Sequence, residues 1–335
     1  MKKAAKKMAA LLLAGVMAAS LAGCGAKADT KENSPANEES YKIGVIQLME
    51  HDALDASYQG FVDGLKEAGY VDGENITIDF QNAQGEVANC DNIATKLVND
   101  KNDLILAIAT PAAQAVAGKT TEIPLLITAV TDPATSGLVE SNEKPGTNVT
   151  GTSDLTPVAQ QIELLIRLFP EAKTVGVLYN SSETNSQFQA AIAKEELEKA
   201  GLAYVDSTVS SSNEIQSVTQ SLIGKVDVIY SPTDNMIATG MAAVASVATE
   251  NHIPCVVGEE GMVRNGGLIT YGINYYNLGK QTAAMAVRIL KGEGKPADMP
   301  IEYLEDVVYT VNKTAAEELQ VEIPKDILDV ANIVE

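Results

Sequence analysis

Short apolar runs alternate with helical patterns along this chain, and the same order of runs and patterns occurs twice. The first copy opens with YKIGVIQ and reaches about residue 130, and the second opens with KTVGVLY and reaches about residue 258. In both copies a helical pattern ends at Ala-Gly, and Gly44 to Gly69 spans the same 25 positions as Gly176 to Gly201. The repeat predicts two similar α/β lobes and a binding site where they face each other.

Strands and helices alternate in each copy. The first copy predicts strands at residues 42–48, 75–80 and 104–109, and helices at 56–68 and 86–99. The second predicts strands at 174–179, 203–209 and 226–230, and helices at 187–200, 214–223 and 237–250. This alternation indicates a mostly parallel sheet with right-handed crossovers. The predicted fold class is α/β, with two doubly wound parallel-sheet lobes.

Three later segments are expected to connect the lobes. Residues 146–157, which are rich in Gly, Thr and Pro, form a first predicted crossover. A helix at about 278–290 is expected to return to the first lobe, and a strand near 303–311 precedes two short helices. Three chain connections between the lobes predict a hinge that restricts how the lobes move relative to each other. The predicted domains are residues 41–150 plus 275–302 (lobe 1) and 151–274 plus 303–335 (lobe 2).

The N-terminal residues carry export signals. Residues 1–23 contain four lysines, no acidic residue and an apolar run, which is typical of a signal peptide. Leu21-Ala22-Gly23-Cys24 resembles a lipobox, so Cys24 is predicted to be lipidated and to anchor the protein outside the cytoplasm. The alternative is an ordinary signal peptide that happens to contain a cysteine. Residues 24–40 are small and polar and are predicted to be a tether.

The composition of the chain and the motifs that it lacks exclude several classes of function. The net charge of −21 argues against a nucleic-acid partner and is attributed to solubility. The two histidines have no partner at metal-ligand spacing, and no GxSxG, P-loop, HExxH or GxGxxG motif is present, so neither catalysis nor a cofactor or metal is expected. Cys90 and Cys255 lie in different copies and are expected to be buried thiols. Sugar-binding sites commonly stack the sugar ring on Trp or Phe, so the absence of Trp disfavours a sugar ligand. The 11 Tyr keep a sugar ligand as an alternative.

Polar segments follow the apolar runs, at the ends of parallel strands where ligands bind. Thr110-Pro111 is expected to begin a helix with a capping hydroxyl, and its first amides could hold a ligand carboxylate; a plain helix cap is the alternative. Asp234 occupies the position in the second copy of the repeat that Thr110 occupies in the first. The two loops that carry these residues should therefore face each other. Asp234 or Glu260 would then pair with an ammonium group, and the ligand would be a zwitterion.

Several segments together resemble a known family: IGVIQLMEHDALDASYQGF, ATPAAQA, AVTDPATSGLV, GTSDL, LYNSSETNS, PTDN and TYGINYYNLG. With the lipobox and tether, the chain looks like a substrate-binding lipoprotein of an ABC importer, and more narrowly it resembles the tryptophan- and tyrosine-binding family over about residues 41–330. The resemblance implies a type I periplasmic-binding-protein fold without catalysis. It also implies capture of an aromatic amino acid (tryptophan, tyrosine or phenylalanine) for a membrane permease and its ATPase.

The residues and the resemblance together give a set of candidate ligand contacts. They are Gln47, Thr110, Pro111, Ala112, Thr131 and Asp132 in the first lobe, and Ser153, Asp154, Asn180, Glu183, Asn185, Asp234 and Glu260 across the cleft. Tyr179, Tyr230 and above all Tyr271 are candidates to stack against an aromatic ligand. The alternatives are a sensor for a membrane kinase, a binding protein for a nucleoside or other small molecule, and an enzyme.

Overall fold

The computed structural model describes residues 40–335. The predicted signal peptide, the lipidated Cys24 and the predicted tether up to residue 39 lie outside these residues. Within residues 40–335, no helix is both long enough and apolar enough to cross a bilayer.

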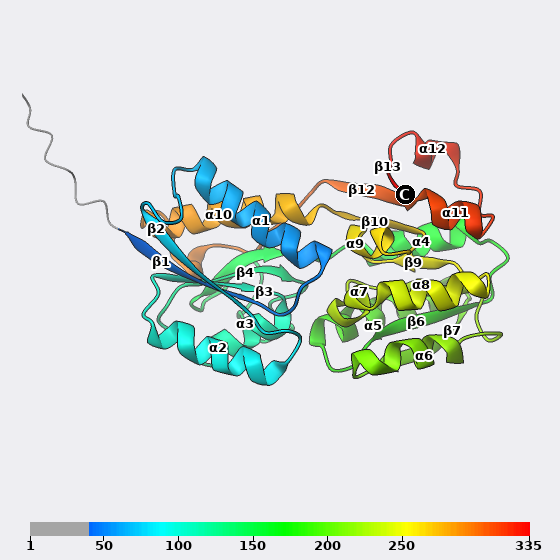
Figure 1. The fold of residues 1–335 in the computed structure, drawn as a ribbon, viewed down its shortest axis with the longest axis horizontal. Helices are drawn as coiled ribbons and strands as arrows, with labels where there is room; N and C mark the ends of the chain where they lie inside the picture. The colour runs from blue at the N-terminus through cyan, green and yellow to red at the C-terminus, as the bar shows by residue number, and fades with distance from the viewer. Residues whose placement is uncertain (1–39) are drawn as a thin grey trace, which may run out of the picture. The chain divides into compact units, whose positions relative to one another are not determined.

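The first sheet has six parallel strands in the order β11-β5-β4-β3-β1-β2. They are β1 (Tyr41–Gln47), β2 (Ile76–Asn82), β3 (Leu104–Ile108), β4 (Leu125–Val130), β5 (Val149–Ser153) and β11 (Glu302–Tyr303). Figure 1 shows α1 (Asp52–Glu67) beside α10 (Tyr275–Leu290) on one face, and α2 (Val87–Asn99) and α3 (Thr110–Ala117) on the other. Helices on both faces explain why β3 and β4 are buried along their whole length and almost entirely apolar.

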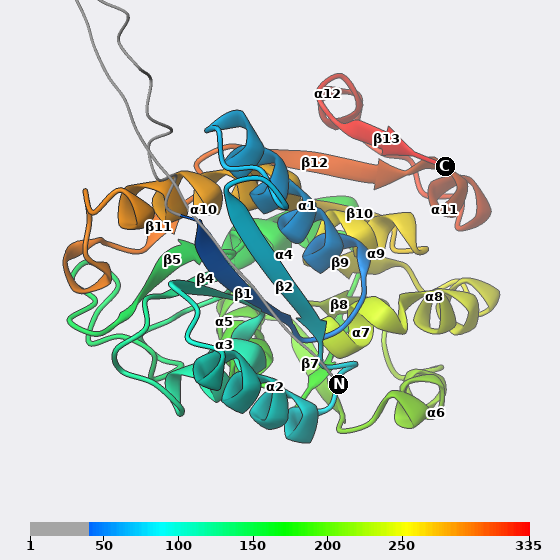
Figure 2. The same ribbon diagram turned by 60° about the vertical axis from the view of Figure 1, so that its left-hand side comes forward.

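The second sheet has seven strands in the order β13-β12-β10-β9-β8-β6-β7. They are β6 (Thr174–Asn180), β7 (Ala203–Val209), β8 (Val228–Ser231), β9 (Cys255–Val257), β10 (Ile269–Ile273), β12 (Val307–Asn312) and β13 (Asn332–Val334). Its helices are α4 (Val158–Leu168), α5 (Thr184–Lys199), α6 (Ile215–Ser221), α7 (Asn235–Thr239), α8 (Met241–Glu250) and α9 (Glu260–Arg264). In Figure 2, β12 and β13 lie near α11 (Lys313–Glu318) and α12 (Lys325–Leu328). Only β12 runs antiparallel to its neighbour β10.

The helix predicted at 278–290 does return to the first sheet, where it packs against α1 as α10. Other predictions need correction. Gly240 divides the helix predicted at 237–250 into α7 and α8. The strand predicted at 303–311 is two strands in different sheets, β11 and β12. Five residues of the predicted crossover 146–157 form strand β5, whose glycine and short polar side chains hid the strand pattern.

The chain crosses between the two sheets three times, which confirms the predicted two-lobed α/β architecture. The crossovers lie between β5 and α4, between β10 and α10, and between β11 and β12. Since β5 continues to Ser153 and β11 includes Tyr303, both of these residues belong to the first sheet. We therefore propose lobe boundaries a few residues beyond the predicted positions 150 and 302.

Both remaining cysteines are buried and unpaired, as predicted. Burial raises the pKa of the Cys90 thiol to about 11 and that of Cys255 to about 12. Cys90 packs in the core of the first lobe and Cys255 in a core cluster of the second. Both behave as small apolar side chains with little thiolate character.

Candidate ligand-binding site

A cavity lies between the two sheets at the carboxyl ends of their strands. The space between its protein atoms is about 280 Å³, part of it open to solvent. Every lining residue lies at or after the end of one of seven strands, β1, β4, β5, β6, β8, β9 and β10, as expected for parallel sheets. The lining residues are His51, Ala53, Leu54, Ala129, Asp154, Asn185, Thr233, Asp234, Asn235, Ala238, Glu259 and Tyr275.

Asp154 sits where the chain first crosses between the lobes. Its carboxylate accepts hydrogen bonds from the Tyr275 hydroxyl (2.8 Å) and from Thr131 Oγ1 (2.9 Å). Ser153 Oγ in turn donates to the carbonyl of Thr131 (2.7 Å). Burial raises the pKa of Asp154 because water no longer solvates its charge. The structure thus places the predicted Asp154 in the cavity, with Thr131 and Ser153 behind it.

Asp234 also lines the cavity, but its oxygens bind backbone amides. It is the N-cap of α7 and accepts a hydrogen bond from the Ile237 amide (2.8 Å). It accepts a second from the Asn180 amide (2.6 Å), at the end of β6. Burial raises its pKa, although these bonds oppose the shift. Asp234 therefore joins two neighbouring strand ends as well as facing the cavity.

Glu183 and Asn185 form the third predicted group, after β6. Glu183 accepts hydrogen bonds from Asn180 Nδ2 (2.9 Å) and from Asn235 Nδ2 (2.6 Å), and it makes no capping bond to α5. Burial, and then the nearby charge of Asp234, raises the pKa of Glu183. Asn185 lines the cavity, and its Oδ1 is buried without a hydrogen-bond partner among the described residues.

The cavity is lined by Glu259 and not by its predicted neighbour Glu260. Glu260 is the first residue of α9 and forms an ion pair with Arg264 one turn later, outside the cavity. Glu259 lines the cavity instead. It is the N-cap of α9 and accepts hydrogen bonds from the amides of Gly261 and Met262. Burial raises the pKa of Glu259 to about 7.

The predicted capping role of Thr110 is also wrong. The N-cap of α3 is Ala109, at φ 82° and ψ 151°, and Thr110 is already helical. The Thr110 hydroxyl is buried and has no partner within residues 40–335. Thr110, Pro111 and Ala112 do not line the cavity. They lie one strand away from it, because the Ala109 amide donates to the carbonyl of Thr128, next to Ala129.

Gln47 and Asp132 hold loops rather than line the cavity. Gln47 Nε2 donates to the carbonyl of Met49 (2.8 Å) and to Asp55 Oδ1 (2.6 Å), which fixes the turn that carries His51. Asp132 accepts hydrogen bonds from the Thr135 amide (2.7 Å) and from Asn142 Nδ2 (3.1 Å), so it closes its own loop.

None of the three tyrosines proposed as stacking partners lines the cavity. Tyr271 packs on Tyr309, with ring centroids 4.4 Å apart, and Tyr179 lies under the Lys194 ammonium group. Tyr230 is fully buried, and its hydroxyl donates to Gln161 Oε1 (2.7 Å). The aromatic residue of the cavity is Tyr275, at the start of α10. Its position after β10 was the available signal, since it follows a strand end as the other site residues do.

Hydrogen bonds cross from one lobe to the other around the cavity. His51 Nε2 lies 3.2 Å from Asn235 Oδ1, and Gln189 Nε2 donates to Thr131 Oγ1 (3.3 Å). Asn265 Nδ2 donates to Asp52 (3.3 Å). Burial lowers the pKa of His51 more than its Asn235 contact and nearby carboxylates raise it. The lobes are therefore in direct polar contact on opposite sides of the cavity.

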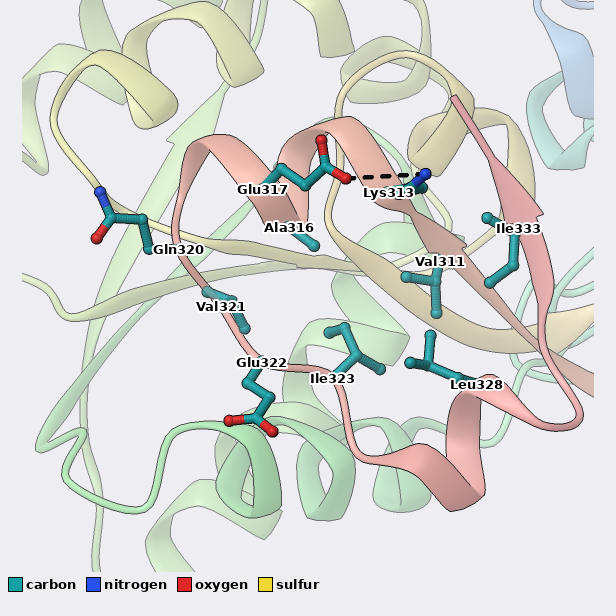
Figure 3. Close-up of a pocket in the computed structure, with 10 residues that line it drawn as sticks. All are labelled: Val311, Lys313, Ala316, Glu317, Gln320, Val321, Glu322, Ile323, Leu328 and Ile333. Atoms are coloured by element: carbon teal, nitrogen blue, oxygen red, sulfur yellow. Dashed lines mark ion pairs between the residues drawn. The ribbon is translucent and has the colours of Figure 1, made fainter.

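A larger, apolar groove lies at the C-terminal end of the chain (Figure 3). It encloses about 930 Å³, part of it open to solvent, between α11, α12 and β13. Val321, Ile323 and Leu328 point into it, and the Lys313–Glu317 ion pair lies at its rim. This groove has no convergent buried polar groups, so the smaller cavity between the lobes is the better candidate site. In the described part of the chain, no group of three or more His, Cys, Asp or Glu could hold a metal ion.

Three known proteins are similar to this chain over nearly its whole length. A tyrosine-binding protein of Clostridioides difficile (strain R20291) is 42% identical over 322 residues, which cover 95% of this chain and 93% of that protein. The crystal structure of an ABC domain in complex with L-Trp, from Streptococcus pneumonia, is 41% identical with a TM-score of 0.85, and the match covers 88% of this chain and 100% of that one.

The ligand-free, open structure of a substrate binding protein with adhesive properties from Clostridium difficile is 47% identical, with a TM-score of 0.69. That match covers 88% of this chain and 99% of the other. Sequence identity is thus higher to the open structure, but structural similarity is higher to the L-Trp complex. The lobes of this chain are therefore arranged more as in the ligand-bound relative. The family of ABC transporter substrate binding proteins matches residues 42–335, and the chain belongs to this family, with its two-lobed type I periplasmic-binding-protein fold.

Proposed function

We propose that this protein captures an aromatic amino acid between its lobes and delivers it to the permease and ATPase of an ABC importer. The observation that carries this proposal is the composition of the cavity, in which buried carboxyls and a tyrosine ring share one small space. The names of the two most informative relatives, one tyrosine-binding and one bound to L-Trp, support the same ligand class. The proposed role includes no chemical conversion of the ligand.

Substrate-binding proteins of ABC importers work outside the cytoplasm, and so does this one. We further propose that Cys24 is lipidated and anchors the protein to the membrane through the polar tether, because a lipobox-like sequence precedes this cysteine.

The ligand ammonium group would bind Asp154. Both oxygens of this carboxylate have one hydroxyl donor each and retain a further lone pair. The aromatic side chain would pack between the Tyr275 ring and the apolar side chains of Leu54, Ala129 and Ala238, which line the same cavity.

The ligand carboxylate would approach the start of α3. Helix N-termini attract anions, and the buried Thr110 hydroxyl still lacks a partner in the described structure. Asp132 closes its own loop and would not contribute, whereas the other predicted residues would support these contacts from behind: Gln47, Thr131, Ser153, Asn180, Glu183, Asn185 and Asp234. Glu259 and Tyr275 take the places predicted for Glu260 and Tyr271.

Calorimetric titration tests this proposal. Residues 25–335, which contain the compact unit 39–335, would be unfolded and refolded to remove any carried ligand. Tyrosine, tryptophan, phenylalanine, leucine, a nucleoside and a hexose would then be titrated. We expect micromolar or tighter binding of at least one aromatic amino acid. Binding of only the nucleoside or the hexose would contradict the proposal.

A matched pair of variants tests the ammonium contact. Asp154→Asn should weaken binding by about 10- to 100-fold, since a charge-assisted hydrogen bond is worth about 1.5–3 kcal/mol. Asp132→Asn is the control, because Asp132 binds only its own loop. Equal effects of the two variants would argue against Asp154.

A further inference from the structure

The cavity between the lobes offers acceptors rather than donors. Three of its lining residues are carboxyls, Asp154, Asp234 and Glu259, and a fourth carboxyl, Glu183, binds the lining residue Asn235. No lysine or arginine from residues 40–335 lines it. His51 is the one basic lining side chain, and burial favours its neutral form. A ligand with hydrogen-bond donors and a positive charge suits this surface.

Asn185 gives independent evidence for a donor on the ligand. Its side chain is 4% exposed and lines the cavity, and its Oδ1 has no partner in the described chain. Its Nδ2 already donates to Ser186 Oγ (3.3 Å). A buried acceptor without a donor costs about 1–3 kcal/mol, so such groups normally have a partner in the working complex.

Helix capping accounts for the burial of two of the lining carboxyls but not of the third. Asp234 and Glu259 each cap a helix through backbone amides, which accounts for their burial. Asp154 caps no helix, and the side chains that donate hydrogen bonds to it are the neutral hydroxyls of Thr131 and Tyr275. A buried carboxylate without a cation costs several kcal/mol. The missing cation of Asp154 is best supplied by the ligand.

The cavity lining offers fewer binding partners to the carboxylate of an amino acid than to its ammonium group. The residues suited to bind it, Thr110 and Ala112, lie one strand away and contribute nothing to the lining. No lysine or arginine of residues 40–335 lines the cavity to pair with an anion. Recognition should therefore depend much more on the ammonium group than on the carboxylate.

We propose that the ammonium group is the obligatory recognition element of this site, and that its ligands include aromatic primary amines without a carboxylate, such as tyramine and tryptamine. This inference rests on the proposed function, because it assigns the aromatic ligand to the same cavity. Deaminated analogues, which keep the ring and the carboxylate, should bind poorly.

Two matched ligand series test the inference on the refolded protein. The first is tyrosine, tyramine and 3-(4-hydroxyphenyl)propionate, and the second is tryptophan, tryptamine and 3-indolepropionate. For the series whose amino acid binds, the amine should bind within about tenfold of it, and the deaminated acid at least about 100-fold more weakly. These ligands differ only in the group under test.

The outcomes separate the two proposals. If an amino acid binds but its amine is more than about 100-fold weaker, the inference is wrong and the proposed function stands. If no member of either series binds and phenylalanine does not bind either, the proposed function itself fails. Asp154→Asn should weaken the amine and the amino acid by similar factors. Should this variant not fold, the two series on the unmodified protein still decide the question.

Discussion

Ala107 and Ala109 are both fully buried at the end of β3, but only Ala109 has a positive φ, of 82°. With ψ at 151°, this backbone conformation favours glycine and costs another residue about 1–3 kcal/mol. Replacement by glycine removes a buried methyl group at either position but relieves strain only at Ala109. Ala109→Gly should therefore destabilise the protein less than Ala107→Gly, by about 1–3 kcal/mol in urea unfolding.

Equal free energies of unfolding for the two variants would mean that Ala109 stores no strain. A difference as expected would connect a strained backbone with the start of α3, where the ligand carboxylate is proposed to approach.

Glu259 gives a pH dependence with a definite sign. Its folded pKa of about 7 exceeds its ordinary value of 4.5, so the folded protein binds a proton that the unfolded chain releases. Its contribution to stability is fully present below about pH 4.5 and is lost as the pH rises through 7. Glu259→Gln, whose single carbonyl oxygen can accept one of the two amide bonds, should flatten this decline by up to about 1.4 kcal/mol per pH unit.

The measurement is urea unfolding between pH 5 and pH 8 without added amino acid. Glu318→Gln is the matched control, because Glu318 is exposed at the end of α11 and does not line the cavity. A Glu259→Gln variant with the slope of the parent protein would show that Glu259 is ionised throughout this range.

At the scale of elements, α1 and α10 approach so closely that only glycine fits between them. A Cβ on Gly279 would lie 2.0 Å from the carbonyl oxygen of Ser57, and one on Gly60 would lie 2.0 Å from that of Tyr276. Both obstacles are backbone atoms, which cannot rotate away. Gly279→Ala should therefore force the helices apart and cost at least about 2 kcal/mol.

Gly118→Ala is the control for this prediction. Gly118 ends α3 with φ −70°, and an added Cβ would make ordinary contacts of 3.4 and 3.6 Å. This change should be nearly neutral in thermal or urea unfolding. Similar losses in both variants would mean that α1 and α10 can separate at little cost.

Element prediction succeeded where the local pattern is strong. The strands that open each copy, and the helices that end at Ala-Gly, occur as predicted. It failed where partners distant in sequence decide the structure. β11 is a strand only because it pairs with β5, and β13 only because it pairs with β12. Two or three residues carry no periodicity by which such strands could be predicted.

At the scale of the whole molecule, Asn235 connects the lobes. Its Oδ1 lies 3.2 Å from His51 Nε2 in the first lobe, and its Nδ2 donates to the buried Glu183 in the second. Asn235→Ala removes both contacts, so the ligand-free protein should shift toward the open arrangement. We expect a larger radius of gyration in X-ray scattering, and ligand affinity about tenfold lower, because less of the protein is closed.

Asn213→Ala, at an exposed position near α6, is the control for this shift. Saturating ligand should return the Asn235→Ala variant to the compact form, since ligand binds the closed state. If scattering and affinity both match the parent protein, the contacts of Asn235 do not stabilise closure.

The sequence by itself determined the two lobes and the sheet edges between which the cavity lies, because strand and helix periodicities are local and the repeat shows that they occur twice. It also identified Asp154, Asn185 and Asp234, which lie in the cavity as strand-end residues should. Only the tertiary structure decided between neighbours such as Glu259 and Glu260, and brought Tyr275 to the site in place of Tyr271. The direction of a side chain after a strand depends on the start of the next helix and on the opposite lobe, and neither is encoded locally.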